Sequence, residues 1–225
     1  MGQAVGDFLP LAVVVAISPI PIVAMVLMLA TPRARTNGTA FAFGWIVGLS
    51  VLGAIVLVLA TGNATEDSGA PATWVDVLNL LFGLAFILLA VRTWLGRPKR
   101  GDEAEMPGWM DRVDDFTTGR SFGAGVVLSA VNPKNLVLTV AGALAIAEAT
   151  LSDGQEVLAL AVFVLIGSLG ILTLLGIYLV VGERAAAQLE RLKVWTAAHN
   201  AAIMTVLLLA LGAKLIGDAI SGFSS

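Results

Sequence analysis

The chain contains no cysteine and only one histidine, His199. Without cysteine there are no disulfides, no thiol–disulfide chemistry and no cysteine-ligated metals, and one histidine leaves little for a metal cluster. Charged residues are also scarce, at 13% of the chain, whereas hydrophobic residues make up 58%. Several apolar runs are longer than the roughly 18 residues that mark a membrane-spanning helix. The composition therefore predicts a multi-pass, all-α membrane protein.

The apolar runs predict six transmembrane helices. We place them at about 7–30, 38–61, 74–96, 121–147, 155–181 and 197–220. Helix breakers fall between the runs, with Pro32 and Asn37-Gly38 after the first and Gly182 after the fifth. The chain then divides into a first three-helix repeat at 1–96, a cytoplasmic amphipathic linker at 97–120 and a second three-helix repeat at 121–225.

Lysine and arginine are distributed unevenly among the connections. The first, third and fifth connections carry most of them. The second and fourth carry none and hold acidic residues instead: Glu66, Asp67, Glu148 and Asp153. The positive-inside rule then predicts cytoplasmic odd connections and both termini outside the plasma (inner) membrane. Lys134 and Lys214 depart from this pattern, and Lys214 lies near a helix end, where we expect its side chain to reach the interface.

Two connecting segments show apolar residues at helical spacing. The first lies in the linker: Met106, Trp109, Met110, Val113 and Phe116. The second precedes the last predicted span: Ala185, Leu189 and Leu192. Such segments either lie on the inner membrane surface or pack as linker helices under the bundle, and the pattern does not separate the two.

The first and fourth predicted spans share an internal pattern. Residues 16–21 and 130–135 each place an apolar pair, a small polar residue and a proline at mid-span. Three crossings reverse the direction of the next half, so the halves form two inverted three-helix repeats with broken first and fourth helices. For Pro19 and Pro21 the alternative is a simple packing kink, which membrane helices tolerate.

The tetrad Asn132-Pro133-Lys134-Asn135 is the strongest candidate site. A lysine near the bilayer centre is costly, and a proline beside it frees backbone groups that need other partners. A cation with directional hydrogen bonds suits an anionic or zwitterionic group, such as a carboxylate, phosphate or sulfate. The predicted substrate-binding residues come from both broken helices: Ser18, Pro19, Pro21, Asn132, Pro133, Lys134 and Asn135. The alternative is a structural lysine whose amine is satisfied by helix carbonyls.

Other polar and glycine positions have simpler interpretations. We expect intramembrane polar groups such as Asn79 and Ser168 to form interhelical hydrogen bonds. Glycines on the second and fifth spans are expected to let helices approach the broken pair closely: Gly44, Gly48, Gly167, Gly170 and Gly176. The sequence contains no nucleophile–base–acid set, glycine-rich phosphate loop or nucleic-acid patch, so we predict no catalytic residue, cofactor, metal or nucleic-acid partner.

Over essentially its whole length the chain resembles the actinobacterial GAP family, also called the Sap or sulfolipid-addressing family, within the lysine-exporter (LysE) superfamily. The motifs that carry the resemblance are Ala16-Ile17-Ser18-Pro19-Ile20-Pro21, Thr31-Pro32-Arg33-Ala34-Arg35 with Asn37-Gly38, Val131-Asn132-Pro133-Lys134-Asn135, and Met106-Pro107-Gly108-Trp109-Met110 with Phe116-Thr117. The resemblance implies a six-helix inverted-repeat fold and a role in moving envelope glycolipids or peptidoglycolipids towards the surface of actinobacteria.

Three functions follow as hypotheses. The first is a transporter-like protein that handles an anionic lipid headgroup at Lys134, with membrane lipids as its partners. The second is a proton-coupled exporter of amino acids or other small solutes. The third is an accessory protein that docks on a larger lipid exporter. Homodimerisation through the glycine-rich faces stays open with each of them.

Overall fold

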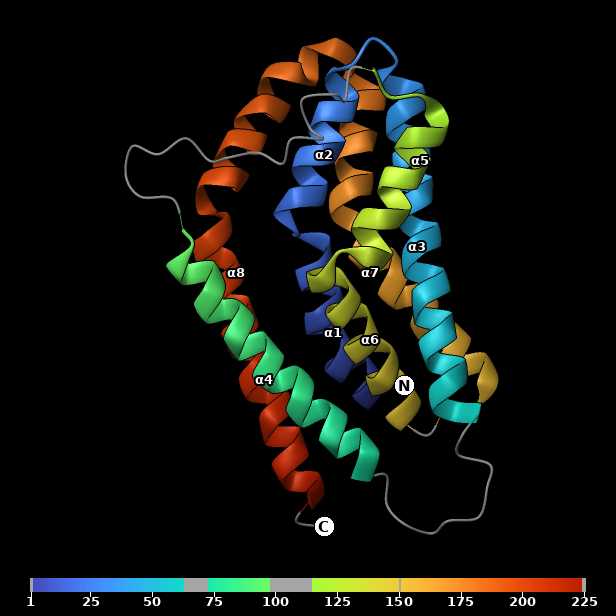
Figure 1. The fold of residues 1–225 in the computed structure, drawn as a ribbon. Coiled ribbons are helices and arrows are strands. Elements are labelled where there is room, and N and C mark those ends of the chain that lie inside the picture. The colour runs from blue at the N-terminus through green and yellow to red at the C-terminus, as the bar shows by residue number, and fades with distance from the viewer. Residues whose placement is uncertain (1, 63–72, 98–114, 150, 224–225) are drawn as a thin grey trace.

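The computed structural model describes residues 2–62, 73–97, 115–149 and 151–223. Within these residues every regular element is a helix, and no strand occurs among them. In chain order (Figure 1) they are α1 (Gly2–Ala16), α2 (Pro19–Ala30), α3 (Ala34–Gly62), α4 (Thr73–Leu95), α5 (Thr118–Val126), the π-helical turn η3 (Val127–Val131), α6 (Pro133–Glu148), α7 (Asp153–Val181), the 3₁₀ turn η4 (Gly182–Ala185) and α8 (Ala186–Phe223).

The helices confirm a multi-pass membrane protein. Three segments are long and apolar enough to cross a membrane: Ala34–Thr61 in α3, Asp153–Val181 in α7 and Ala201–Phe223 in α8. Two bent helix pairs pass the same test only when each is taken as one unit: Val5–Ala16 with Pro19–Ala30, and Thr118–Val131 with Pro133–Glu148. In α4 the described apolar stretch is shorter, Asn79–Leu95. Length and composition therefore support up to five spans in the described part of the chain.

The two bends fall at the predicted prolines. The axis turns by 45° between α1 and α2, and by 61° at the junction before α6. Pro19 and Pro133 are the first residues of α2 and α6, where a missing N–H costs the helix little. The residues before them, Ser18 and Asn132, are non-helical, with ψ of 116° and 118°, because the proline ring disfavours helical geometry at the preceding residue.

Glycines bring helices against the broken spans. A side chain at Gly44 would overlap the Phe122 carbonyl of α5, and one at Gly48 would overlap Ser129 of η3. On α7, a side chain at Gly170 would overlap the Ala16 carbonyl of α1.

The remaining two predicted glycines differ from each other. A Cβ at Gly167 would lie 3.2 Å from Val15 of α1, whereas one at Gly176 would meet nothing within 4 Å. The prediction of close approach is therefore confirmed at four positions and wrong at Gly176, which faces open space.

Helices α4 and α8 form a second close pair at the edge of the bundle (Figure 1). A Cβ at Gly83 of α4 would lie 3.0 Å from the Gly212 carbonyl of α8, and a Cβ at Gly212 would lie 2.9 Å from the Gly83 carbonyl. The reciprocal contact shows that the two backbones approach each other closely at this crossing, as small residues allow in membrane helices.

One predicted boundary is wrong. Asn37 and Gly38 lie inside α3 instead of ending a loop, because the Asn37 side chain donates to the Phe116 carbonyl (3.0 Å) and Gly38 leaves room for Leu29. The last predicted span, at about 197–220, agrees with the membrane-length segment Ala201–Phe223, although helix α8 itself begins earlier, at Ala186. Only Gly182, with φ of +68°, separates it from α7 through a short turn.

The second amphipathic segment packs against the bundle. Ala185 and Leu189 are 1% and 4% exposed and belong to the main hydrophobic core, where α8 contacts α2. Of the two alternatives for this segment, the packed helix is therefore the one observed. The linker pattern from Met106 to Val113 lies outside the described residues.

The described elements place the chain ends and connections at opposite ends of the bundle. Both termini lie at the lower end in Figure 1, and the connections from α2 to α3 and from α7 to α8 lie at the upper end. The arginines of these two connections, Arg33 and Arg184, therefore lie at the end away from both termini.

Candidate functional site

The two helix breaks are neighbours in the bundle. Helix α1, which ends at the first break, packs on α6, which begins at the second, and α2 contacts η3. Both breaks lie at about mid-height in Figure 1. The fold therefore brings together the elements that carry all seven predicted site residues.

The predicted residues differ in their exposure. Ser18, Pro19 and Pro21 are buried on the first broken span. Asn135 is fully buried, at 0% exposed. Asn132 and Lys134 are half-buried and Pro133 is exposed. A large ligand therefore meets only the second break without a movement of the helices.

Asn132 holds the start of α6 in place. Its side-chain Oδ1 accepts from the backbone N–H of Lys134 (3.2 Å), and its carbonyl accepts from Leu136 (2.8 Å). This is the ordinary role of asparagine before the first turn of a helix. The Asn132 side chain therefore positions the backbone of Lys134.

The π turn before the break rearranges the carbonyls that the sequence predicts to be free. The Asn132 N–H donates to the Val127 carbonyl (2.9 Å), five residues back. The Asn135 amide then donates to the Leu128 carbonyl (2.8 Å). One predicted ligand donor, the Asn135 NH₂ group, is therefore used to satisfy the protein's own backbone.

Three buried polar atoms on α6 and α7 have no hydrogen-bond partner among the described residues: Asn135 Oδ1, Thr139 Oγ1 and Ser168 Oγ. Thr139 lies one turn beyond Asn135 on α6, and Ser168 lies on α7, which contacts α6. Leaving such a group unpaired costs roughly 1–3 kcal/mol. The predicted interhelical bond of Ser168 is therefore not formed among the described residues.

Lys134 carries the charge of this site. No carboxylate among the described residues lies within ion-pair distance of its amine. A half-buried ammonium without an acidic partner is able to pair with an anionic ligand.

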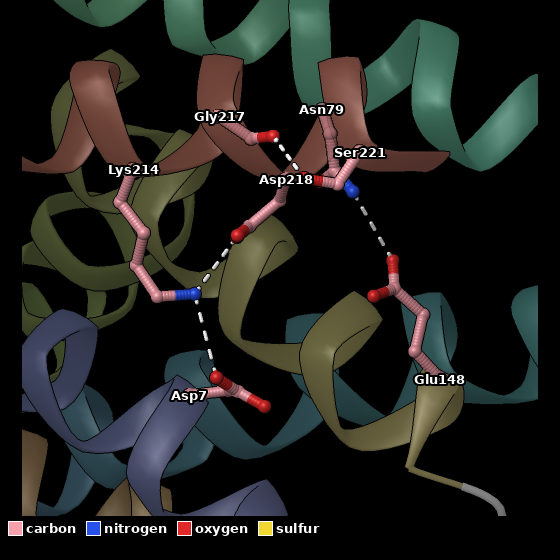
Figure 2. Close-up of polar contacts among 7 residues, drawn as sticks. All are labelled: Asp7, Asn79, Glu148, Lys214, Gly217, Asp218 and Ser221. Carbon is pink, nitrogen blue, oxygen red and sulfur yellow. Dashed lines mark hydrogen bonds and ion pairs between the residues drawn. The ribbon is translucent and has the colours of Figure 1, made fainter. Parts of the chain in front are cut away.

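A second polar cluster, which the sequence did not predict, lies near the end of the bundle that holds the termini. A cavity of about 240 Å³ is lined by residues of α1, α4, α6 and α8, among them Asp7, Asn79, Glu148, Lys214 and Asp218. We call these five residues the terminal-end cluster. Figure 2 shows the Lys214 amine between the carboxylates of Asp7 (3.4 Å) and Asp218 (2.8 Å), with Asn79 donating to Glu148 (3.4 Å).

The cluster corrects the expectation for Lys214. Its amine does not simply extend to the interface; it joins α8 to α1 through Asp7. The sequence contained part of the signal, because Lys214 and Asp218 stand four residues apart on one helix face. The contribution of Asp7 depends on the packing of helices far apart in the chain and had no local signal.

Comparison with known families and proteins completes the description of the site. A family model described as "Sap, sulfolipid-1-addressing protein" matches residues 8–221. This range includes both helix breaks and the whole terminal-end cluster except Asp7. No curated protein and no solved structure matches the chain.

Proposed function

The chain belongs to the Sap, sulfolipid-1-addressing protein family, and from that premise we propose that it is a transporter-like membrane protein that assists the export of an anionic envelope lipid. The observation that carries this proposal is the unpaired Lys134 at the junction of two broken helices. The proposal is one of binding and translocation and includes no covalent step.

Repeated structural details support the inverted-repeat part of the proposal. Helices α3 and α7 both have 29 residues, and Gly48 and Gly167 are each the fifteenth residue of their helix. Gly48 faces Ser129 and Gly167 faces Val15. Ser129 and Val15 each lie four residues before the proline at their break. Equivalent residues of the two halves therefore meet equivalent partners in the opposite half.

Helix contacts follow the same exchange between halves. Contact of α1 with α7 has its counterpart in α5 with α3, and contact of α2 with α8 has its counterpart in α6 with α4. Helices α4 and α8 are equivalent to each other in the two halves, and they contact each other through the equivalent glycines Gly83 and Gly212. We therefore propose α4 as a sixth span, which completes two inverted three-helix repeats as in transporters that bind at the repeat interface. Membership of the LysE superfamily is proposed on the same basis.

The chemistry at the second break suits an acidic headgroup. Lys134 supplies a positive charge, and the hydroxyl of Thr139, on the same helix, is a donor without an acceptor among the described residues. A sulfate or phosphate offers several strong acceptor oxygens to such a set. The acyl chains of a lipid already lie in the hydrocarbon region of the membrane. Only the headgroup needs a polar site, and it needs one while it passes the bilayer centre.

Charge distribution supports one orientation. Arg33 and Arg184 lie at the end of the bundle away from the termini, and Asp7 and Asp218 lie near the termini. We propose that the arginine-rich end is cytoplasmic and that both termini lie outside the plasma membrane. Export then moves the lipid from the arginine end towards the terminal-end cluster.

The test is mass spectrometry of lipids that copurify with the protein from an actinobacterial host. We expect an anionic lipid enriched with the wild type and reduced by roughly tenfold or more in Lys134→Ala, the loss expected for one charge-assisted contact. Lys214→Ala, which removes a lysine that already has acidic partners, is the matched control. Equal recovery of all lipids with wild type and Lys134→Ala contradicts the proposal.

A second candidate function rests on the terminal-end cluster. Its cavity of about 240 Å³ is too small for a lipid but fits a solute of amino-acid size, and it offers both carboxylates and an ammonium group. A zwitterion is complementary to such a lining. This supports a proton-coupled exporter of small solutes. Transport assays in vesicles loaded with a panel of amino acids would detect it. If no amino acid of the panel moves, this candidate is excluded.

An accessory role in a larger lipid exporter is the third candidate. The predicted docking surface consists of both amphipathic segments. Ala185 and Leu189 of the second are buried in the core, and most of the first, in the linker, lies outside the described residues. Affinity purification in mild detergent tests it, and recovery of no partner protein argues against it. Homodimerisation is tested in the same preparation by the mass of the purified particle.

A further inference from the structure

An open groove lies between α3 and α5 at the arginine-rich end of the bundle. Its volume is about 670 Å³. We call it the α3–α5 groove. Six of the residues that line it fall into a polar and an aromatic group: Arg35, Thr36, Thr39 and Thr118, and Phe43 and Phe122. The groove is separate from the helix breaks and from the terminal-end cluster.

The polar group lies where the two helices begin. Arg35 is the second residue of α3 and Thr118 is the first of α5. Arg35, Thr36 and Thr118 are all exposed. Arg35 forms no ion pair with a carboxylate among the described residues. This end of the groove therefore presents an unpaired guanidinium flanked by hydroxyl groups, which matches a phosphate or sulfate.

The aromatic group lies further along both helices. Phe43 is eight residues after Arg35, about 12 Å along the helix axis, and its side chain is 61% exposed. The rings of Phe43 and Phe122 lie 5.8 Å apart at 42°. The groove thus passes from a basic end to an apolar end over a distance comparable to part of an acyl chain.

We propose that the α3–α5 groove binds an anionic lipid of the cytoplasmic leaflet, with its headgroup at Arg35 and an acyl chain along Phe43 and Phe122. The charge complementarity of the basic end selects an acidic lipid, and the order of polar and apolar groups matches the order of headgroup and chain. The proposal rests on the proposed function only for the orientation that makes this end cytoplasmic. The groove would be the site where the protein first binds the lipid, whereas Lys134 would bind the headgroup later, at the bilayer centre.

Gly119 permits a direct test without damage to the fold. It lines the groove, and a Cβ at this position would meet no atom within 4 Å. Gly119→Trp therefore fills the groove from α5 and leaves the helix contacts intact. The matched control is Gly176→Trp on α7, because Gly176 also faces open space and does not line the groove. Arg35→Gln removes the charge, with Arg33→Gln, two residues earlier and outside the groove lining, as its control.

The experiment is photo-crosslinking in proteoliposomes with phosphatidylglycerol or phosphatidylcholine carrying a diazirine on one acyl chain. Crosslinked residues are identified by peptide mass spectrometry. We expect phosphatidylglycerol, but not phosphatidylcholine, to label peptides that contain Phe43 or Phe122. Labelling should be lost in Gly119→Trp, fall roughly tenfold in Arg35→Gln and persist in Gly176→Trp and Arg33→Gln.

Two results overturn the proposal. Equal labelling by both lipids that survives Gly119→Trp means that the groove meets only bulk lipid. A purified particle with the mass of a dimer that Gly119→Trp converts to a monomer means that a second copy covers the face. The variant Lys134→Ala separates this proposal from the proposed function. If this variant keeps both its groove labelling and the wild-type amount of copurified lipid, the site at Lys134 is rejected and the groove site is retained.

Discussion

Two neighbouring residues of the tetrad have different roles. The sequence groups Lys134 and Asn135 as ligand-binding residues. The Asn135 amide instead satisfies the Leu128 carbonyl of the π turn, whereas the Lys134 amine has no acidic partner among the described residues. A buried carbonyl beside a break needs a donor because the helix no longer supplies one. Asn135 therefore stabilises the break, and of the two side chains only that of Lys134 stays free for the ligand that we propose.

Asn135→Leu should reduce stability. The substitution removes the 2.8 Å hydrogen bond to Leu128 and leaves a half-buried carbonyl without its donor. We expect a loss of about 1–3 kcal/mol in the free energy of unfolding, measured by denaturation in detergent. Stability equal to that of the wild type would mean that water replaces the amide.

Thr139→Val separates binding from folding. The Thr139 hydroxyl is fully buried and has no partner among the described residues, so replacing it by a methyl of similar shape should not lower stability. If the hydroxyl binds the headgroup, the copurified anionic lipid should fall while thermal denaturation stays at or above the wild-type temperature. A fall in stability with unchanged lipid would assign Thr139 a structural role.

At the scale of elements, the breaks depend on the helices that pack against them. Straight helices α3 and α7 approach the bent spans through Gly48 and Gly167. A bent span exposes backbone to its neighbours, and a glycine allows the neighbour to approach that backbone. The bends and the glycines are therefore parts of one packing arrangement.

Gly48→Leu should disrupt this arrangement, and Gly176→Leu should not. A side chain at Gly48 would overlap Ser129 of η3, whereas one at Gly176 would meet nothing within 4 Å. We expect Gly48→Leu to lose at least about 1–3 kcal/mol through overpacking and Gly176→Leu to remain near wild type. Thermal denaturation of both variants in one detergent measures the difference, and equal losses would reject the contact.

At the scale of the whole molecule, the terminal-end cluster links the two halves of the chain. Asp7 belongs to the first half, and Lys214 and Asp218 belong to the second. Their side chains are 39–47% exposed, and ion pairs this accessible contribute about 0–1 kcal/mol in water. The cluster therefore contributes little to the stability of the fold, which makes Lys214→Ala a mild substitution.

Orientation is testable because the chain has no cysteine to remove. Single cysteines at Gly2, near one end of the bundle, and at Arg184, at the other, report the two sides. We expect a membrane-impermeant maleimide to label Gly2→Cys in intact cells and Arg184→Cys only after permeabilisation. The opposite pattern would place the arginine-rich end outside and reverse the proposed direction of export.

The sequence by itself determined the class of protein, up to five of the six predicted spans and the positions of both breaks. These features follow from local causes. A long apolar helix is stable in the hydrocarbon region of a membrane, and Pro19 and Pro133 lack the backbone N–H that a helix hydrogen bond needs. Only the tertiary structure decided that Asn135 serves the backbone, that Gly176 packs against nothing, and that Asp7 meets Lys214. The physical reason is that these contacts join helices distant in the chain, and their relative placement is set by the packing of the whole bundle.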